Sequence, residues 1–195
     1  WLLVEPLAAL VARHPGIQLH ITGGSFDKIV QQLRVGAVDV ALGYEAAFEA
    51  QPEFRLDTLP PLRAKFFVRH GHPILEREAV TIAEMSQYDL ISPSGSPPYD
   101  MVLRKAYEDA DPEGHGHMHI VDYFPIVARL VRNSDAIGLV SLEFTKSRMF
   151  RRHFTCVPYT ESLPPSPLCC ATRLKWSPRP AVRAFIQVCR ERFPR

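Results

Sequence analysis

The sequence predicts an α/β fold. Apolar runs with strand character alternate with helical patterns along the whole chain, which is the order of elements in α/β proteins. Gly23-Gly24 ends one apolar run directly before a helical pattern, and Gly36 is placed to end that helix before the short apolar run Val38–Leu42. This strand–helix–strand order predicts a right-handed crossover and mostly parallel sheets.

The remaining elements follow from periodicity and turn signals. Leu3, Leu7 and Leu10 share one face of a first helix, and Ile17–Ile21 alternates apolar and polar residues as a half-buried strand does. Thr81 and Glu84 have the spacing of a capping box. Helices are predicted over Leu2–Arg13, Phe26–Val35, Asp100–Asp109, Asp122–Asn133, Ser141–Phe150 and Pro180–Phe193, and strands over Ile17–Ile21, Val38–Leu42, Lys65–Arg69, Leu90–Ser92, Met118–Val121, Ala136–Val140, Phe154–Tyr159 and Leu168–Thr172. Glu45–Leu59 is predicted to be a loop.

Composition excludes several classes of protein. The 195 residues suit one domain or two small lobes, and 46% hydrophobic with 23% charged residues is ordinary for a globular chain. A net charge of +2 is too small to indicate a nucleic-acid-binding surface by itself. No apolar run reaches the ~20 residues of a membrane span. The start, "WLLVEPLAALVARHPG", lacks the features of a signal peptide and is expected to begin within a fold.

The four cysteines predict a reducing compartment. Cys156, Cys169, Cys170 and Cys189 form no C-x-x-C pair, so a disulfide framework or zinc site is not expected. Cys169 and Cys170 would point to opposite faces of a strand. We therefore expect four small buried side chains in a cytoplasmic protein.

The chain resembles the effector-binding domain of LysR-type transcriptional regulators. The matching segments come in family order over nearly the whole chain: "LAALVARHPGIQLHI", "LRVGAVDVALG", "VRHGHPILEREAVTIAEMSQYDLI" and "IVARLVRNSDAIGLVS". The second of these is the most specific. Asn133-Ser134-Asp135 departs from the family, which usually has small residues and glycine there.

The resemblance implies a type 2 periplasmic-binding-protein-like fold, with two Rossmann-like lobes joined by a two-stranded hinge. Lobe I would be residues 1–64 plus 167–195, and lobe II would be residues 65–166. A small effector would bind in the cleft between the lobes. A first strand just before Trp1 and an upstream winged helix-turn-helix are expected from the family and are absent from this sequence.

The resemblance also implies the partners. They are a small-molecule effector, a second copy in a homodimer or homotetramer, and DNA only through the missing N-terminal domain; no membrane and no cofactor is expected. The dimer would pack the first helix and second strand of lobe I against a helix of lobe II, Tyr123–Asn133.

Ser25 is the first candidate effector-binding residue. It follows a strand and starts a helix, where a hydroxyl, backbone N–H groups and the positive helix end favour an anion. The matching Ser or Thr of the family commonly contacts the effector. Gly24 and Phe26 flank it, and the alternative is that Ser25 is a plain N-cap.

Lobe II supplies the other candidates. Ser94, Gly95 and Ser96 lie in the polar loop "SPSGSPP", and Tyr123, Phe124 and Ser141 lie at two further junctions of strand and helix. Each has an alternative: a solvent turn for the loop, and a core or dimer contact for the aromatic pair. Asp122 is expected to be an N-cap, and Tyr99 is a weaker aromatic candidate. Arg63 and Lys65 could supply positive charge or remain solvated. A pocket of this composition would suit a small organic acid, with space for an aromatic ring.

"GHGHMHI" raises the question of a metal. His115, His117 and His119 would share one face of an extended chain, which is a possible transition-metal arrangement. No carboxylate or Cys at a fitting spacing completes the set, so no metal site is predicted and a solvated strand entry is the alternative.

Two other functions remain open. A solute-binding protein of a transporter would share the fold, although the unpaired cysteines and "LRVGAVDVALG" argue against it. An enzyme is not predicted, because the sequence has no G-x-S-x-G, P-loop, G-x-G-x-x-G or H-E-x-x-H motif.

Overall fold

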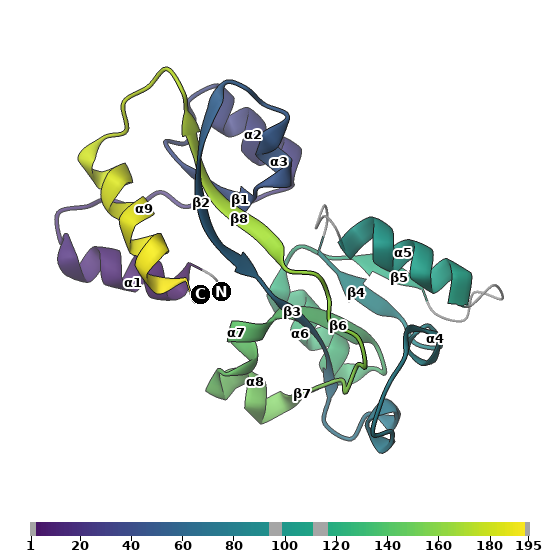
Figure 1. Cartoon of the computed structure of the whole chain (residues 1–195). Helices are drawn as coiled ribbons and strands as arrows, with labels where there is room; N and C mark the ends of the chain where they lie inside the picture. Colours follow the sequence, from purple (N-terminus) through teal and green to yellow (C-terminus); the bar gives the residue numbers. More distant parts are fainter. Residues whose placement is uncertain (1–2, 94–98, 111–116, 194–195) are drawn as a thin grey trace. The chain divides into compact units, whose positions relative to one another are not determined.

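The computed structural model describes residues 3–93, 99–110 and 117–193, with the side chains of residues 99–102 also outside the description. The chain forms two compact units, Trp1–Pro61 with Ser166–Arg195 (unit 1) and Leu62–Pro165 (unit 2). Figure 1 traces both units along the sequence. No helix among the described residues is long and apolar enough to cross a membrane.

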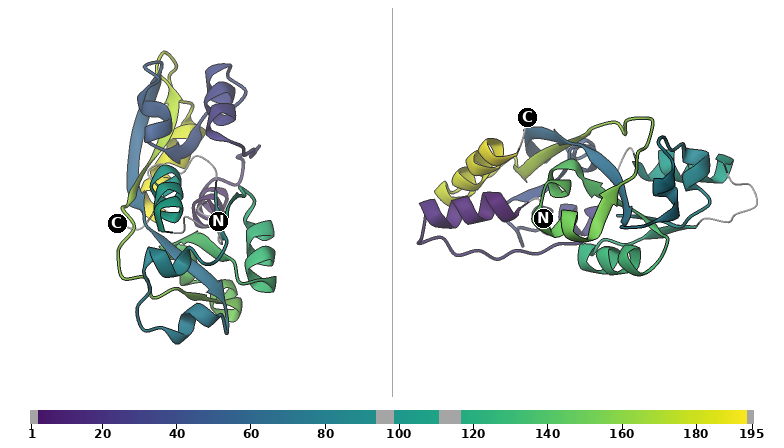
Figure 2. Two further views of the ribbon diagram at one scale, coloured as in Figure 1. Left: turned by 90° about the vertical axis from the view of Figure 1, so that its right-hand side faces the viewer. Right: turned by 90° about the horizontal axis from the view of Figure 1, so that it is seen from below.

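Unit 1 is built on a three-stranded sheet with strand order β1-β8-β2. Its elements are α1 (Val4–Arg13), α2 (Phe26–Arg34), β1 (Ala41–Tyr44), α3 (Ala46–Glu49), β2 (Phe54–Leu62), β8 (Ser166–Arg173) and α9 (Pro180–Arg192). α2 and α3 cover one face of the sheet, where Leu33, Phe48 and Cys169 are almost fully buried. α1 packs along α9, as the views in Figure 2 show, and Arg13 pairs with Glu191 at 2.5 Å.

Unit 2 has a five-stranded sheet with strand order β5-β4-β6-β3-β7. Its elements are β3 (Ala64–Arg69), the 3-10 helix η1 (Pro73–Glu76), α4 (Ile82–Met85), β4 (Leu90–Ser92), α5 (Tyr99–Ala110), β5 (Met118–Ile120), α6 (Phe124–Asn133), β6 (Ile137–Ser141), α7 (Leu142–Thr145), α8 (Arg148–His153) and β7 (Phe154–Cys156). Successive side chains of β3 enter different cores: Phe66 joins the cluster with α4 and α5, and Phe67 joins the cluster with α6, α7 and α8.

The α/β class is confirmed, but the prediction of mostly parallel sheets is wrong. β4 pairs parallel with β5 and with β6, whereas β3 pairs antiparallel with both β6 and β7, and β1 with β8. Alternating strands and helices indicate which segments are extended, but they do not determine the direction in which distant segments pair.

Two local predictions are also wrong. Ile17–Ile21 forms no strand, because a cavity lies between it and residues 37–42 and no backbone ladder joins the two segments. The predicted crossover from it is therefore not seen, and the following strand is Ala41–Tyr44. The predicted loop Glu45–Leu59 contains α3 and most of β2. Pro60 and Pro61 are unusual in a strand. β2 tolerates both prolines because it is an edge strand.

Several local predictions are confirmed. The Thr81 backbone N–H donates to Glu84 Oε2 at 2.7 Å, which is half of the expected capping box. Gly36 follows Val35, the C-cap residue of α2, and has a φ of +77°, a conformation that glycine adopts without steric cost. One N-cap prediction is wrong. Asp122 is not the N-cap of α6, since that helix begins at Phe124 with Tyr123 as its N-cap residue.

Candidate functional site

The start of α2 presents Ser25 with an uncommitted hydroxyl. Ser25 is the N-cap residue, with extended backbone angles, but its side chain makes no capping hydrogen bond. Its side chain is exposed, and no hydrogen bond of its hydroxyl is found among the described residues. The plain N-cap alternative therefore lacks the bond that defines it, and the hydroxyl and the first N–H groups of α2 are available to an anion.

Phe26 belongs to a small aromatic group beside Ser25. Its ring centroid lies 5.5 Å from that of Tyr44 on β1, with the planes tilted by 56°. Gly43 lies close to the Phe26 ring. A Cβ on Gly43 would come within 3.6 Å of Phe26 and within 3.1 Å of Phe48. Gly24 has no positive φ, and a Cβ there would meet only the flexible side chain of Lys28, so steric need alone does not explain Gly24.

Arg173 of β8 binds the segment "LRVGAVDVALG" and thereby holds α2 in place. Nη1 of Arg173 donates to the carbonyl oxygens of Leu33 at 2.8 Å and of Val38 at 2.9 Å. Its guanidinium also lies 4.9 Å from the Trp176 ring centroid. One side chain of β8 thus satisfies carbonyl groups on both sides of Gly36 and fixes the position of α2.

In unit 2, the carboxyl ends of the parallel strands β4, β5 and β6 lie at one edge of the sheet. Ser92 ends β4 there, fully buried, and its carbonyl accepts from the Val121 N–H at 2.9 Å. Ligands of open α/β sheets bind outside such carboxyl ends. The predicted residues Ser94, Gly95 and Ser96 follow directly but lie outside the described residues.

Tyr123 and Phe124 differ in their surroundings. The Tyr123 side chain is 64% exposed, whereas Phe124 packs against Phe144 at 4.8 Å and Phe67 at 6.3 Å between ring centroids. Phe124 is therefore largely part of the core, and Tyr123 is the one whose ring is free for a partner.

The Ser141 hydroxyl makes a capping hydrogen bond at the start of α7. It ends β6, and its Oγ accepts from the Phe144 N–H at 3.3 Å at the start of α7. The pairing of Ala64 with Ser141 places Arg63 beside it, and the Leu142 N–H donates to the Arg63 carbonyl at 2.8 Å. Arg63 and Lys65 are exposed and border a cavity of about 400 Å³ within unit 2, together with Tyr159.

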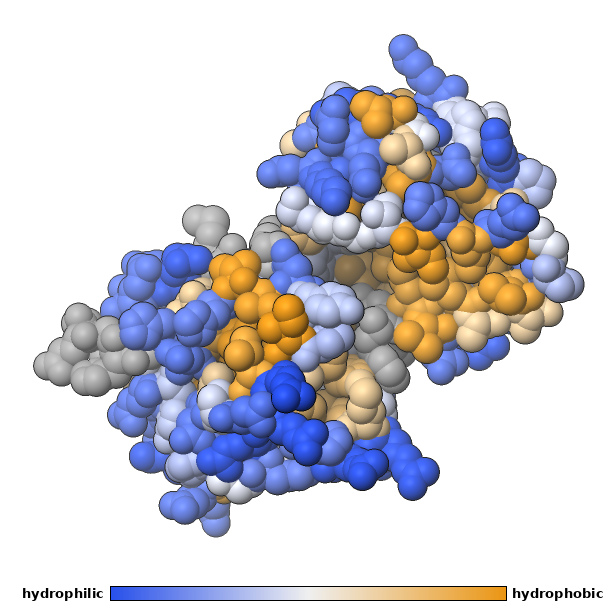
Figure 3. Space-filling view, turned by 180° about the vertical axis from the view of Figure 1, so that it is seen from behind, coloured by the Kyte–Doolittle hydropathy of each residue, from blue (hydrophilic) through white to orange (hydrophobic). Residues whose placement is uncertain are grey.

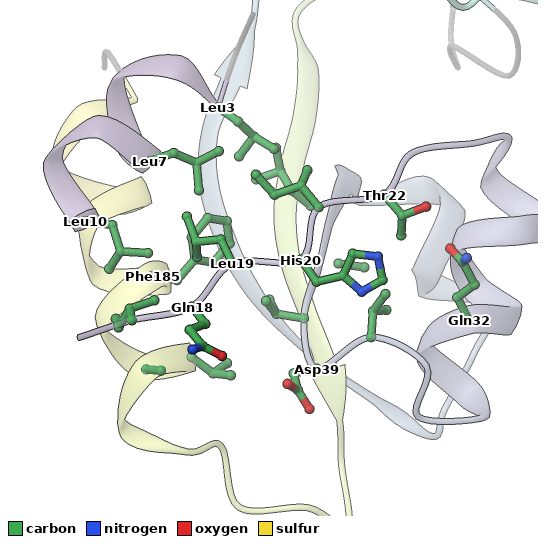
Figure 4. A pocket seen from close by; sticks show the side chains of 18 of the residues that line it. Leu3, Leu7, Leu10, Gln18, Leu19, His20, Thr22, Gln32, Asp39 and Phe185 are labelled. Atoms are coloured by element: carbon green, nitrogen blue, oxygen red, sulfur yellow. The ribbon is translucent and has the colours of Figure 1, made fainter. Parts of the chain in front are cut away.

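A cavity of about 370 Å³ lies within unit 1 (Figure 4). Leu7 and Leu10 of α1 and Phe185 of α9 form its apolar side, and His20, Gln32 and Asp39 are among its polar lining residues. It separates the extended segment 17–22 from residues 37–42. None of the predicted effector-binding residues lines it.

No pattern in the sequence indicated the contact of Asp89 with the histidine stretch. Asp89 Oδ1 accepts from the His117 backbone N–H at 2.9 Å, and its two oxygens lie 3.3 Å from His117 Nδ1 and 3.4 Å from His119 Nε2. Burial alone would raise the pKa of Asp89, but the hydrogen bonds and the charge of His119 outweigh it and lower the pKa. His115 lies outside the described residues, and no group of metal ligands forms within the part of the chain that is described.

Exposed apolar side chains gather on both units (Figure 3). On unit 2 they include Tyr123, Ile126 and Leu130, which are 64%, 51% and 43% exposed and share one face of α6. On unit 1 they include Val4 and Val11 of α1, with Leu19 and Ile21. Such patches commonly mark contact surfaces.

Comparison with known proteins gives a consistent result. The family described as "LysR substrate binding domain" matches residues 1–194. The HTH-type transcriptional regulator PcaQ of Agrobacterium fabrum is 26% identical over 93 residues, which are 48% of this chain and 30% of that protein. The match thus spans under a third of the curated relative.

Solved structures share the fold. Reduced OxyR from N. meningitidis has a TM-score of 0.76 and 17% identity, over 97% of this chain and 88% of that one. The effector-binding domain of QuiR in complex with shikimate has a TM-score of 0.72 and 15% identity, over 97% and 88% of the two chains.

Proposed function

Because the chain belongs to the family of LysR substrate-binding domains, we propose that it senses a small organic carboxylate and thereby controls a transcriptional regulator. Binding can control the regulator only if the ligand has different affinities for two states of the protein. The observation that carries the choice of ligand is the free, exposed hydroxyl of Ser25 at the start of α2.

Two groups of residues would hold the effector. Ser25, with Gly24 and Phe26, offers a hydroxyl, N–H donors and an aromatic ring from unit 1. From unit 2 we propose the loop residues Ser94, Gly95 and Ser96, the exposed ring of Tyr123, and the neighbours Phe124 and Ser141. The resemblance implies that one ligand contacts both groups. Shikimate, bound by the QuiR domain, is a small carboxylic acid of the proposed class.

Dimerisation is the second part of the proposal. The apolar face of α6 would pack on α1 and Ile17–Ile21 of a second copy, because both surfaces expose large apolar side chains. We further propose a cytoplasmic location, DNA binding through an upstream helix-turn-helix, and tetramers of the longer protein.

A panel of small acids tests the ligand class. Thermal unfolding would be followed with benzoate, shikimate and succinate, each beside its neutral amide. A carboxylate that raises Tm while its amide does not supports the proposal, since a ligand that binds the native state raises the apparent stability. A panel without any such rise contradicts it.

The rival functions have distinct tests. The coding sequence upstream of Trp1 would show a helix-turn-helix for a regulator and an export signal for a transporter's solute-binding protein. An enzyme would convert its ligand, so recovery of the stabilising acid unchanged after long incubation supports a sensor.

A further inference from the structure

A cluster of arginines lies on unit 2, outside the proposed effector-binding residues. Its members are Arg129 and Arg132 on α6 and Arg148, Arg151 and Arg152 on α8. All five are exposed, and none forms an ion pair within the described residues. Strongly hydrophilic side chains border the apolar area of this unit in Figure 3.

α6 and α8 lie beside each other, since Val131 of α6 and Phe150 of α8 belong to one core cluster. Burial, followed by the charges of Arg132, Arg152 and His70, lowers the pKa of His153. α6 and α8 therefore bring Arg132 and Arg152 near His153, and no carboxylate contributes to this shift. Two acids near in sequence have other partners: Asp135 pairs with Arg69 at 2.6 Å, and Glu143 with Lys146 at 2.9 Å.

The cluster does not reflect a generally basic unit. Residues 62–165 contain 12 Lys and Arg against 13 Asp and Glu, so this unit is nearly neutral. The five arginines therefore do not result from an overall excess of positive charge. All five members of the cluster are arginines, whose planar guanidinium donates two parallel hydrogen bonds to a phosphate. Arg148, Arg151 and Arg152 follow the i, i+3, i+4 spacing that puts them on one side of α8.

We propose that this arginine surface binds the phosphate backbone of double-stranded nucleic acid. The contact would add affinity and orientation without reading bases. It revises the expectation that DNA is touched only by the upstream domain, and it does not depend on the identity of the effector. An acidic polypeptide is the other polyanion that could bind here, and Met149, 52% exposed on α8, would suit it.

The test measures binding of the 195-residue chain to a fluorescent duplex of about 24 base pairs and arbitrary sequence, at about 50 to 200 mM NaCl. The variant is R148A/R151A/R152A. The control is R55A/K175A/R179A, which removes the same charge from exposed positions of unit 1 that form no ion pair with any residue the structure describes. The conservative variant R148K/R151K/R152K keeps the charge and removes the guanidinium geometry.

The first variant should weaken binding at low salt at least about tenfold and flatten the slope of log K against log salt by roughly two to three, whereas the control changes affinity less than about threefold. The lysine variant should retain the slope and lose part of the affinity. Equal losses in variant and control, or no binding by the wild type at low salt, would overturn the proposal. Stronger competition by poly-glutamate than by unlabelled duplex at equal charge would also overturn it, in favour of an acidic polypeptide.

Discussion

Gly138 of β6 lies directly against the ring of Phe67 on β3. The two residues are register partners, and a Cβ on Gly138 would lie 2.3 Å from Phe67 Cε1. Phe67 is fully buried, with Phe150 and Phe154 packed around its ring. The glycine therefore makes the space that the aromatic core of unit 2 needs.

Gly138→Ala should destabilise the protein by about 1–3 kcal/mol, because the ring cannot move without disturbing its neighbours. Urea unfolding would measure the loss. Gly16→Ala is the control, since no atom lies within 4 Å of a Cβ there. Equal stability of the two variants would show that the core around Phe67 can adjust.

Removal of the Arg173 guanidinium should destabilise unit 1. Arg173→Leu leaves the carbonyl groups of Leu33 and Val38 without this donor, at a cost of about 1–3 kcal/mol. Arg55→Leu, at an exposed site with no ion pair in the described part of the chain, should cost less than about 0.5 kcal/mol. Similar free energies of unfolding for both variants would mean that α2 does not depend on Arg173.

The contact of Asp89 with His117 and His119 should make stability depend on pH. The pKa of Asp89 is lowered in the folded state, so its contribution is present above the unfolded pKa of about 3.9 and is lost as the pH falls through the folded value. The stability difference between wild type and Asp89→Asn should therefore be fully present above about pH 5 and shrink as the pH falls towards about 3. Urea unfolding at several pH values would measure it, with the exposed Asp27→Asn as control. A difference that stays constant with pH would contradict this role.

The apolar face of α6 predicts a change of oligomeric state. Ile126→Glu with Leu130→Glu would place charges on two exposed positions and should shift a dimer to monomer in sedimentation. Arg55→Glu is the charge-matched control, because it makes the same total change in charge at an exposed position of unit 1. The prediction fails if wild type and the α6 variant sediment alike.

Local signals in the sequence were reliable where the chain itself supplies the partner. The capping box of Thr81 and the end of α2 at Gly36 each depend on residues within a few positions. The extended segment Ile17–Ile21 depends on a neighbouring strand, which its own pattern cannot provide. β2 was missed for a related reason, because Pro60 and Pro61 break a central strand but not an edge strand.

The candidate site was predictable only in part. Ser25 could be placed before a helix from the order of glycines and apolar residues, but the absence of its capping bond depends on geometry. Asp89 could not be connected with His117, since 28 residues separate them and only the pairing of β4 with β5 brings them together. The packing of Phe124 against Phe144 is likewise a long-range result.

Calorimetric titration of wild type and Ser25→Ala with the carboxylate that raises Tm most tests the central claim directly. Ser25→Ala should bind about fivefold or more weakly, equivalent to about 1 kcal/mol, with unchanged Tm because no cap is lost. Ser147→Ala, which does lose a capping bond to Phe150, should lower Tm and leave the affinity unchanged. Wild-type affinity in Ser25→Ala, or a wild type that no carboxylate saturates, would contradict the account.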